Sequence, residues 1–171
     1  MTLQLPRTLK SLRWPIATDL ASDADLIRRG RYGVIEIRKG RLASIAFRPW
    51  PKLISLPEVW WLGGGFHDRT TGDVCRLYFN QPRSCPQYLA LMYAVSSHDA
   101  RYATIRRAAQ VLDEVARIKA SDAIVCEASN LRISDRLLTR WGWERHLPDS
   151  PRRHFIKRFY GNYPPAVADD R

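Results

Sequence analysis

The stretch DAIVCEASNLRISDRLLTRWGWERHLPDSPRRHFIKRFYG, residues 122–161, is the most informative part of this chain for its fold. Its first residues, Asp122–Glu127, contain a short apolar run that is typical of a buried strand. The next segment, Leu131–Trp141, places its apolar residues on one helical stripe, and Asn130 before it is a suitable capping residue. Apolar and basic residues then alternate over His154–Tyr160, as in a half-exposed strand. The stretch therefore predicts a strand, a helix and a second strand.

The same kind of pattern continues on the N-terminal side of this stretch. Arg101–Lys119 has apolar residues on one helical face and charged residues on the other, which predicts an amphipathic helix. Before it, Tyr88–Ser96 is an apolar run of strand length. From Tyr88 onward we therefore expect strand, helix, strand, helix and strand, which indicates an α/β protein.

This order of elements resembles the C-terminal half of the GNAT superfamily, the acyl-CoA N-acyltransferases. In that family a strand leads to a helix that Asn opens and that Gly and an aromatic residue close. The matching residues here are Asn130, Gly142 and Trp143. The resemblance implies a GNAT-like mixed antiparallel and parallel sheet flanked by helices. It also implies acyl transfer to an unidentified amine, with acetyl-CoA or another acyl-CoA as co-substrate.

The N-terminal half reads as strands with one short helix. Tyr32–Arg38 and Arg41–Arg48 alternate in polarity and meet at Lys39 and Gly40, which predicts a hairpin. Further predicted elements are a helix over Ser22–Arg29, capped by Ser22 or Asp23, and strands over Val59–Leu62 and Asp73–Phe79. The pair of helices that usually follows the first GNAT strand has no counterpart in this pattern.

Length and composition favour one domain. The chain has 171 residues and 45% hydrophobic content, enough for one core and too little for two. We predict an N-terminal extension or edge over residues 1–30, a single GNAT-like domain over 31–162 and a disordered tail over 163–171. The three cysteines show neither disulfide nor metal-site spacing, and no stretch has the length of a signal peptide core or a membrane span. These features predict a reduced, cytoplasmic protein without a bound metal.

The charge of the chain favours anionic partners. Its formal net charge is +11, with the excess at the two ends of the domain. Both nucleic acid and the phosphates of coenzyme A suit such a surface. The alternative to an enzyme is therefore a catalytically inactive GNAT-fold module that binds nucleic acid or another polyanion. A basic surface that only contacts solvent explains the same composition.

The resemblance also implies a cofactor site. In the family, the loop before the helix carries Arg or Gln, two residues, Gly, one residue, and Gly or Ala, so that backbone N–H groups wrap the pyrophosphate. Here Arg101 matches, whereas Thr104 and Arg106 replace the small residues, and we expect their side chains to crowd the pyrophosphate. Arginine side chains would then contact phosphate in a different pose. The implied cofactor-binding set is Ala94, Val95, Ser96, Arg101, Tyr102, Thr104, Arg106, Arg107 and Asn130.

Candidate catalytic groups are few. Glu127 ends an apolar strand and is the carboxylate best placed to act as general base for an amine; a strand end in solvent or a partner for Arg132 is the alternative. The tyrosine that the family uses as general acid is replaced by Leu138. Possible substitutes in this sequence are Tyr93, Tyr102 and Tyr160.

Overall fold

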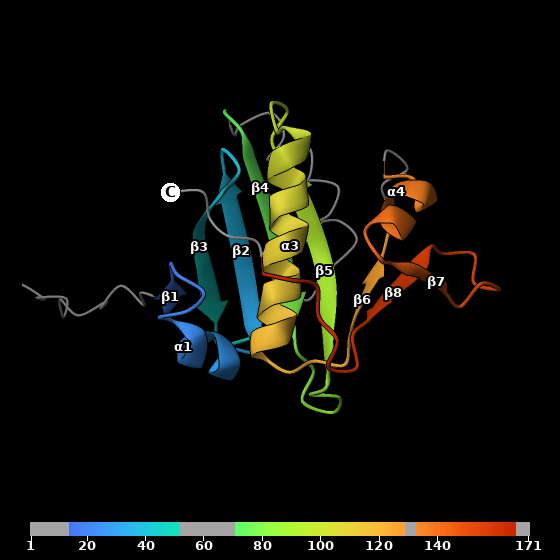
Figure 1. The fold of residues 1–171 in the computed structure, drawn as a ribbon, viewed down its shortest axis with the longest axis horizontal. Coiled ribbons are helices and arrows are strands. Elements are labelled where there is room, and N and C mark those ends of the chain that lie inside the picture. The colour runs from blue at the N-terminus through green and yellow to red at the C-terminus, as the bar shows by residue number, and fades with distance from the viewer. Residues whose placement is uncertain (1–13, 52–70, 129–132, 167–171) are drawn as a thin grey trace, which may run out of the picture.

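The computed structural model describes residues 14–51, 71–128 and 133–166. These residues form an α/β fold with an eight-stranded mixed sheet in the order β1-β3-β2-β4-β5-β6-β8-β7 (Figure 1). The helices and strands are β1 (Ile16–Ala17), α1 (Ala24–Arg29), β2 (Tyr32–Arg38), β3 (Arg41–Arg48), β4 (Val74–Asn80), β5 (Tyr88–Ser96), α3 (Tyr102–Ile118), β6 (Ala123–Glu127), α4 (Asp135–Arg140), β7 (Glu144–His146) and β8 (His154–Arg158). The α/β class predicted from sequence is confirmed.

One pair of neighbouring strands in this sheet is parallel. β5 and β6 run in the same direction and are joined through α3, whereas the other six neighbouring pairs are antiparallel. A parallel pair needs a crossover, and the long amphipathic helix supplies it. Since the N-terminal ends of helices after strands lie at the carboxyl edge of a sheet, the start of α3 lies near the ends of β5 and β6 (Figure 1).

The predicted hairpin is confirmed at the turn. β2 and β3 pair antiparallel with Arg38 opposite Arg41. The two residues between them, Lys39 and Gly40, have φ of 50° and 76°, as a two-residue turn of the primed kind requires. Sequence alone was sufficient here because the turn residues and the alternating strands are all local.

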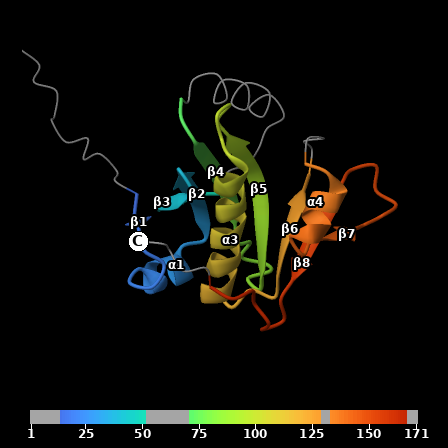
Figure 2. The same cartoon turned by 45° about the horizontal axis from the view of Figure 1, so that its top comes forward.

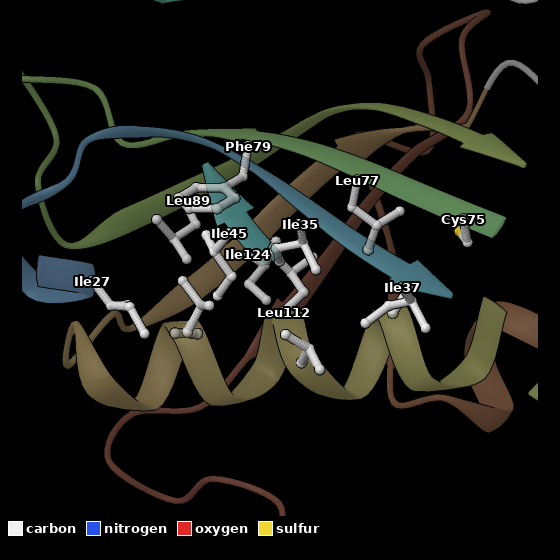
Figure 3. Close-up of a cluster of buried hydrophobic side chains, with 14 of the residues drawn as sticks. Ile27, Ile35, Ile37, Ile45, Cys75, Leu77, Phe79, Leu89, Leu112 and Ile124 are labelled. Atoms are coloured by element: carbon white, nitrogen blue, oxygen red, sulfur yellow. The ribbon is translucent and has the colours of Figure 1, made fainter. Parts of the chain in front are cut away.

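The core lies between α3 and the sheet. Ile35, Ile37 and Ile45 point toward Leu112 of the helix, and all four side chains are buried (Figure 3). Gly33 is required in this layer, since a Cβ there would come within 2.4 Å of the Phe79 ring. The buried apolar layer explains why α3 covers this face of the sheet.

The predicted boundaries of several elements agree with the structure. The strand over Tyr88–Ser96 is β5, and the helix over Arg101–Lys119 is α3 with its two cap residues. The predicted strand Val59–Leu62 lies outside the described residues. None of the helices in the described parts of the chain has the length and apolar content that a membrane crossing requires.

The start predicted for the last helix was wrong. α4 begins at Asp135 rather than Leu131, and Ser134 is its N-cap, with Oγ accepting a hydrogen bond from Leu137 N at 3.2 Å. Ser caps a helix as well as Asn, and Ser134 is followed by an acidic residue that suits a helix start. Asn130, the predicted cap, lies outside the described residues.

The end predicted for that helix was right. Gly142 has φ of 83°, and its N–H donates to Thr139 O at 2.9 Å. The N–H of Trp143 donates to Leu138 O at 3.0 Å, and the side chains of these two residues are buried in the core cluster. This is the Schellman arrangement, in which a glycine in the left-handed region ends the helix.

Candidate functional site

The parallel strands β5 and β6 stop pairing toward the carboxyl edge of the sheet. Their pairing covers Tyr88–Leu91 against Ala123–Cys126, and β5 then continues to Ser96 without β6 beside it. Both views show the ribbons of β5 and β6 separating toward this edge of the sheet (Figure 1 and Figure 2). β6 ends one residue beyond this pairing, at Glu127. We call this region the fork, with the continuing part of β5 as its long arm and the end of β6 as its short arm.

An irregularity in β5 lies where the fork opens. Tyr78 of β4 is opposite Tyr93, whereas Phe79 is opposite Leu91, so β5 holds one extra residue, Met92, between them. Such a bulge bends its strand and increases its twist. The bulge at Met92 directly follows Leu91, the last β5 residue that pairs with β6, and Ala94 beyond it is exposed.

The loop from β5 to α3 is anchored to the start of β4. Ser97 Oγ donates to Gly72 O at 2.5 Å and accepts from Val74 N at 3.1 Å, and the residue is buried. Further along, Arg101 N donates to Asp73 Oδ1 at 2.8 Å. These bonds position the first turn of α3 at the open end of the fork.

The first turn of α3 has two backbone N–H groups without an acceptor in the described structure. Thr104 N and Ile105 N both donate to Arg101 O, at 3.0 and 3.2 Å. In the described parts of the chain, no hydrogen bond is made by the N–H groups of Tyr102 and Ala103. These two groups, at the positive end of the helix dipole, suit an anion.

The predicted cofactor side chains divide into two groups. Arg101, Tyr102 and Arg106 are exposed, as phosphate contacts would need. Thr104 and Arg107 are instead buried, with 0% and 6% of their surface exposed. The Thr104 side chain therefore points into the protein, and the crowding expected from it does not occur on the exposed side of the helix; Arg107 likewise does not add a surface charge.

An aromatic contact links the start of α3 to the end of α4. Trp141 Nε1 donates to Tyr102 Oη at 3.2 Å, and the two ring centroids are 6.0 Å apart. Nothing in the sequence pattern pairs these residues, which are 39 positions apart. The contact brings α4 next to the helix end that carries the two open donors.

Glu127 is the last residue of β6, on the other arm of the fork. Its carboxylate lies 3.4 Å from Arg152 Nη1, and 43% of the side chain is exposed. Its predicted partner, Arg132, lies outside the described residues. Glu127 is thus accessible to an acceptor, but it lacks the apolar surroundings that we expected for a general base.

The tyrosines considered as general acids lie in different places. Tyr93 is half-buried on β5, where burial and then the neighbouring Tyr78 raise its pKa. Tyr102 is at the start of α3, and Tyr160 is exposed after β8. Tyr93 is therefore the tyrosine nearest in sequence to the bulge and the fork.

Burial makes two of the cysteines poor nucleophiles. Burial raises the pKa of Cys75 and Cys126 to about 12, with Asp73 adding to the shift at Cys75 and Arg153 opposing it at Cys126. Both thiols therefore stay protonated near neutral pH. Neither of these two residues therefore suits the role of a thiolate nucleophile.

Comparison with family models, with curated proteins and with solved structures finds no match for this chain.

Proposed function

We propose that this chain is an acyl-CoA-dependent N-acyltransferase with a GNAT-like fold. The observation that carries the proposal is the fork, where β5 departs from β6 beside a helix end with two open N–H donors. Backbone donors at a helix start and a nearby strand edge are complementary to a chain of phosphates and amides. The GNAT resemblance implies this placement for the acyl carrier.

The pyrophosphate and the pantetheine of acyl-CoA each have binding groups in the proposed site. The N–H groups of Tyr102 and Ala103 bind the pyrophosphate, together with the exposed side chains of Arg101 and Arg106. The backbone of Ala94–Ser96 pairs with the amides of pantetheine, as the resemblance implies. This site differs from the glycine-containing family loop because more of its affinity comes from arginine charge.

The reaction is a direct transfer. The lone pair of a neutral amine attacks the thioester carbonyl carbon, the new C–N bond forms, and the C–S bond breaks. Glu127 accepts the proton that the amine loses, directly or through a water molecule, and the departing thiolate takes up a proton. Because the attacking amine must be neutral, we expect the reaction to be faster at mildly alkaline pH, where more of the amine is neutral.

The decisive experiment measures acetyl-CoA binding by isothermal titration to two variants of one residue. Tyr102→Pro removes the side chain and the N–H, while Tyr102→Ala removes the side chain alone. Proline suits this first helical position, because Arg101 before it is already extended, with φ −78° and ψ 152°. We expect Tyr102→Pro to bind about tenfold or more weakly than Tyr102→Ala, the loss typical of a charged hydrogen bond.

The titration also tests whether the start of α3 holds the phosphates, and thermal unfolding tests the polyanion-binding module. Equal affinities for the two variants would show that the helix end does not hold the phosphates. If the parent protein gives no heat with acetyl-CoA but is thermally stabilised by single-stranded RNA or DNA, the polyanion-binding module replaces the enzyme.

A further inference from the structure

A concave region lies on the face of the sheet opposite α3. Along β2, Ile35 and Ile37 face the helix and are buried, so Val34 and Glu36 point to the other side. A hollow of about 350 Å³ lies on that side, and its lining includes Trp14, Val34, Glu36, Arg48, Arg76 and Tyr78. Its volume is within the range of small-molecule sites.

The carboxylate in this hollow is already neutralised. Arg38 Nε and Arg76 Nε each donate to a different oxygen of Glu36, both at 2.5 Å. Burial alone would raise the pKa of Glu36, but the hydrogen bonds and charges of these two arginines lower it overall. Glu36 therefore stays ionised and balances one guanidinium, which leaves the hollow with an excess of positive charge.

Arg48 supplies the group that points to a ligand. Its Nε and Nη2 are buried and have no hydrogen-bond partner among the described residues. Its guanidinium lies over the Tyr78 ring, 5.7 Å from the centroid. Burial lowers the pKa of Arg48, yet an arginine remains charged near neutral pH. Buried charged donors without acceptors are rare in folded proteins, and a rotation of the Arg48 side chain would turn these N–H groups toward an anion in the hollow.

We propose that this hollow binds a small carboxylate with a flat or branched apolar body. After such a rotation, the planar Arg48 guanidinium would match the two oxygens of a carboxylate. The Trp14, Val34, Ala46 and Tyr78 side chains offer apolar and aromatic surface to the rest of the molecule. A single net charge and a cavity of this size favour a compact monoanion over a polyanion. The site does not depend on acyl transfer, because none of its lining residues belongs to the fork.

Phenylacetate and its uncharged analogue phenylacetamide are the probes, and binding is measured by isothermal titration to the full chain. We expect phenylacetate to bind at least tenfold more tightly than phenylacetamide. Arg48→Gln should weaken phenylacetate binding at least tenfold. The matched control is Arg41→Gln, which removes the same charge from an exposed residue of the same strand and should leave the affinity unchanged.

A second variant keeps the test valid if Arg48→Gln does not fold. Val34→Phe fills the hollow from the neighbouring strand and leaves Arg48 in place, so phenylacetate binding should be lost while the thermal midpoint stays near that of the parent. Three results would each overturn the proposal: no heat with phenylacetate, equal affinity for the amide, or the same loss in Arg41→Gln as in Arg48→Gln.

Discussion

The two ends of α3 differ in how completely their polar groups are used. At the C-terminal end, Lys119 Nζ donates to Gln81 Oε1 at 2.9 Å and to Arg28 O at 3.2 Å, and Ser121 N donates to Ala116 O at 2.9 Å. At the N-terminal end, the N–H groups of Tyr102 and Ala103 have no such partners in the described structure. One end of the helix therefore serves the fold, while the other remains available to a ligand.

The difference extends along the strands beside the helix. Near the C-terminal end of α3, β5 and β6 pair, and Leu89 and Ile124 are fully buried. Near its N-terminal end, β5 continues without β6 beside it, and Ala94, Arg101 and Tyr102 are exposed. Substitutions toward the C-terminal end should mainly change stability, and those at the N-terminal end should mainly change binding.

The largest loss of stability should come from Asp113→Ala in the middle of α3. Asp113 Oδ2 lies 2.6 Å from Lys157 Nζ of β8, and both side chains are largely buried. Removing the carboxylate leaves Lys157 buried without its counter-ion, which should lower the free energy of unfolding by about 3–5 kcal/mol. Urea unfolding measures the change. The double variant Asp113→Leu with Lys157→Met should recover most of it, and no recovery would contradict this explanation.

A smaller, pH-dependent effect should come from Lys119. Burial, and then the nearby charge of Arg31, lower the pKa of Lys119 from 10.5 to about 8. Between pH 8 and 10.5 the unfolded chain therefore binds more protons at this residue than the folded protein, so its contribution to stability rises with pH in this window. We expect the unfolding free energy of the parent, measured relative to that of Lys119→Met, to rise by about 2 kcal/mol over this window, as urea unfolding at several pH values measures. The comparison is needed because the buried thiols of Cys75 and Cys126 lower the stability of both proteins above pH 9. An equal pH dependence in the two proteins would assign the effect to other groups.

At the N-terminal end, Asp73→Ala should have a modest effect. The carboxylate accepts the Arg101 N–H just before the helix, much as a capping side chain does. Its removal should cost about 1 kcal/mol of unfolding free energy, the typical value for a lost cap. The control is Asp99→Ala, which removes an exposed carboxylate from the loop between β5 and α3. If Asp73→Ala lowered the unfolding free energy as much as Asp113→Ala, the proposed difference between the two ends of α3 would be wrong.

The smallest change in stability should come from Arg106→Ala. This exposed side chain lies in the first turns of α3, and we expect its loss to alter the unfolding free energy by no more than about 0.5 kcal/mol. On the proposed function, the same change weakens acetyl-CoA binding about tenfold or more, and rising salt weakens parent binding. Arg117→Ala, at the other end of α3, removes the same charge and should leave the affinity unchanged. An unchanged affinity in Arg106→Ala would remove this arginine from the site.

Local patterns were sufficient wherever one segment determined its own structure. The periodicity of Tyr102–Ile118 and the alternation of Tyr32–Arg38 predicted a helix and a strand, because each buries one face against a single layer. Gly142 ended its helix as predicted because only a residue tolerant of positive φ suits that position. The start of the same helix was misplaced, since Asn130 and Ser134 are both good caps and local sequence does not choose between them.

The sequence by itself determined the α/β class, most strand and helix boundaries, and the arginines at the start of α3. Only the tertiary structure decided that β6 leaves β5 after Leu91, that Trp141 contacts Tyr102, and that Arg48 lies over Tyr78. These contacts join residues that are distant in the chain, and their formation depends on how strands are ordered and twisted across the whole sheet. Periodicity records which face of an element is buried, but it carries no information on which other element covers it.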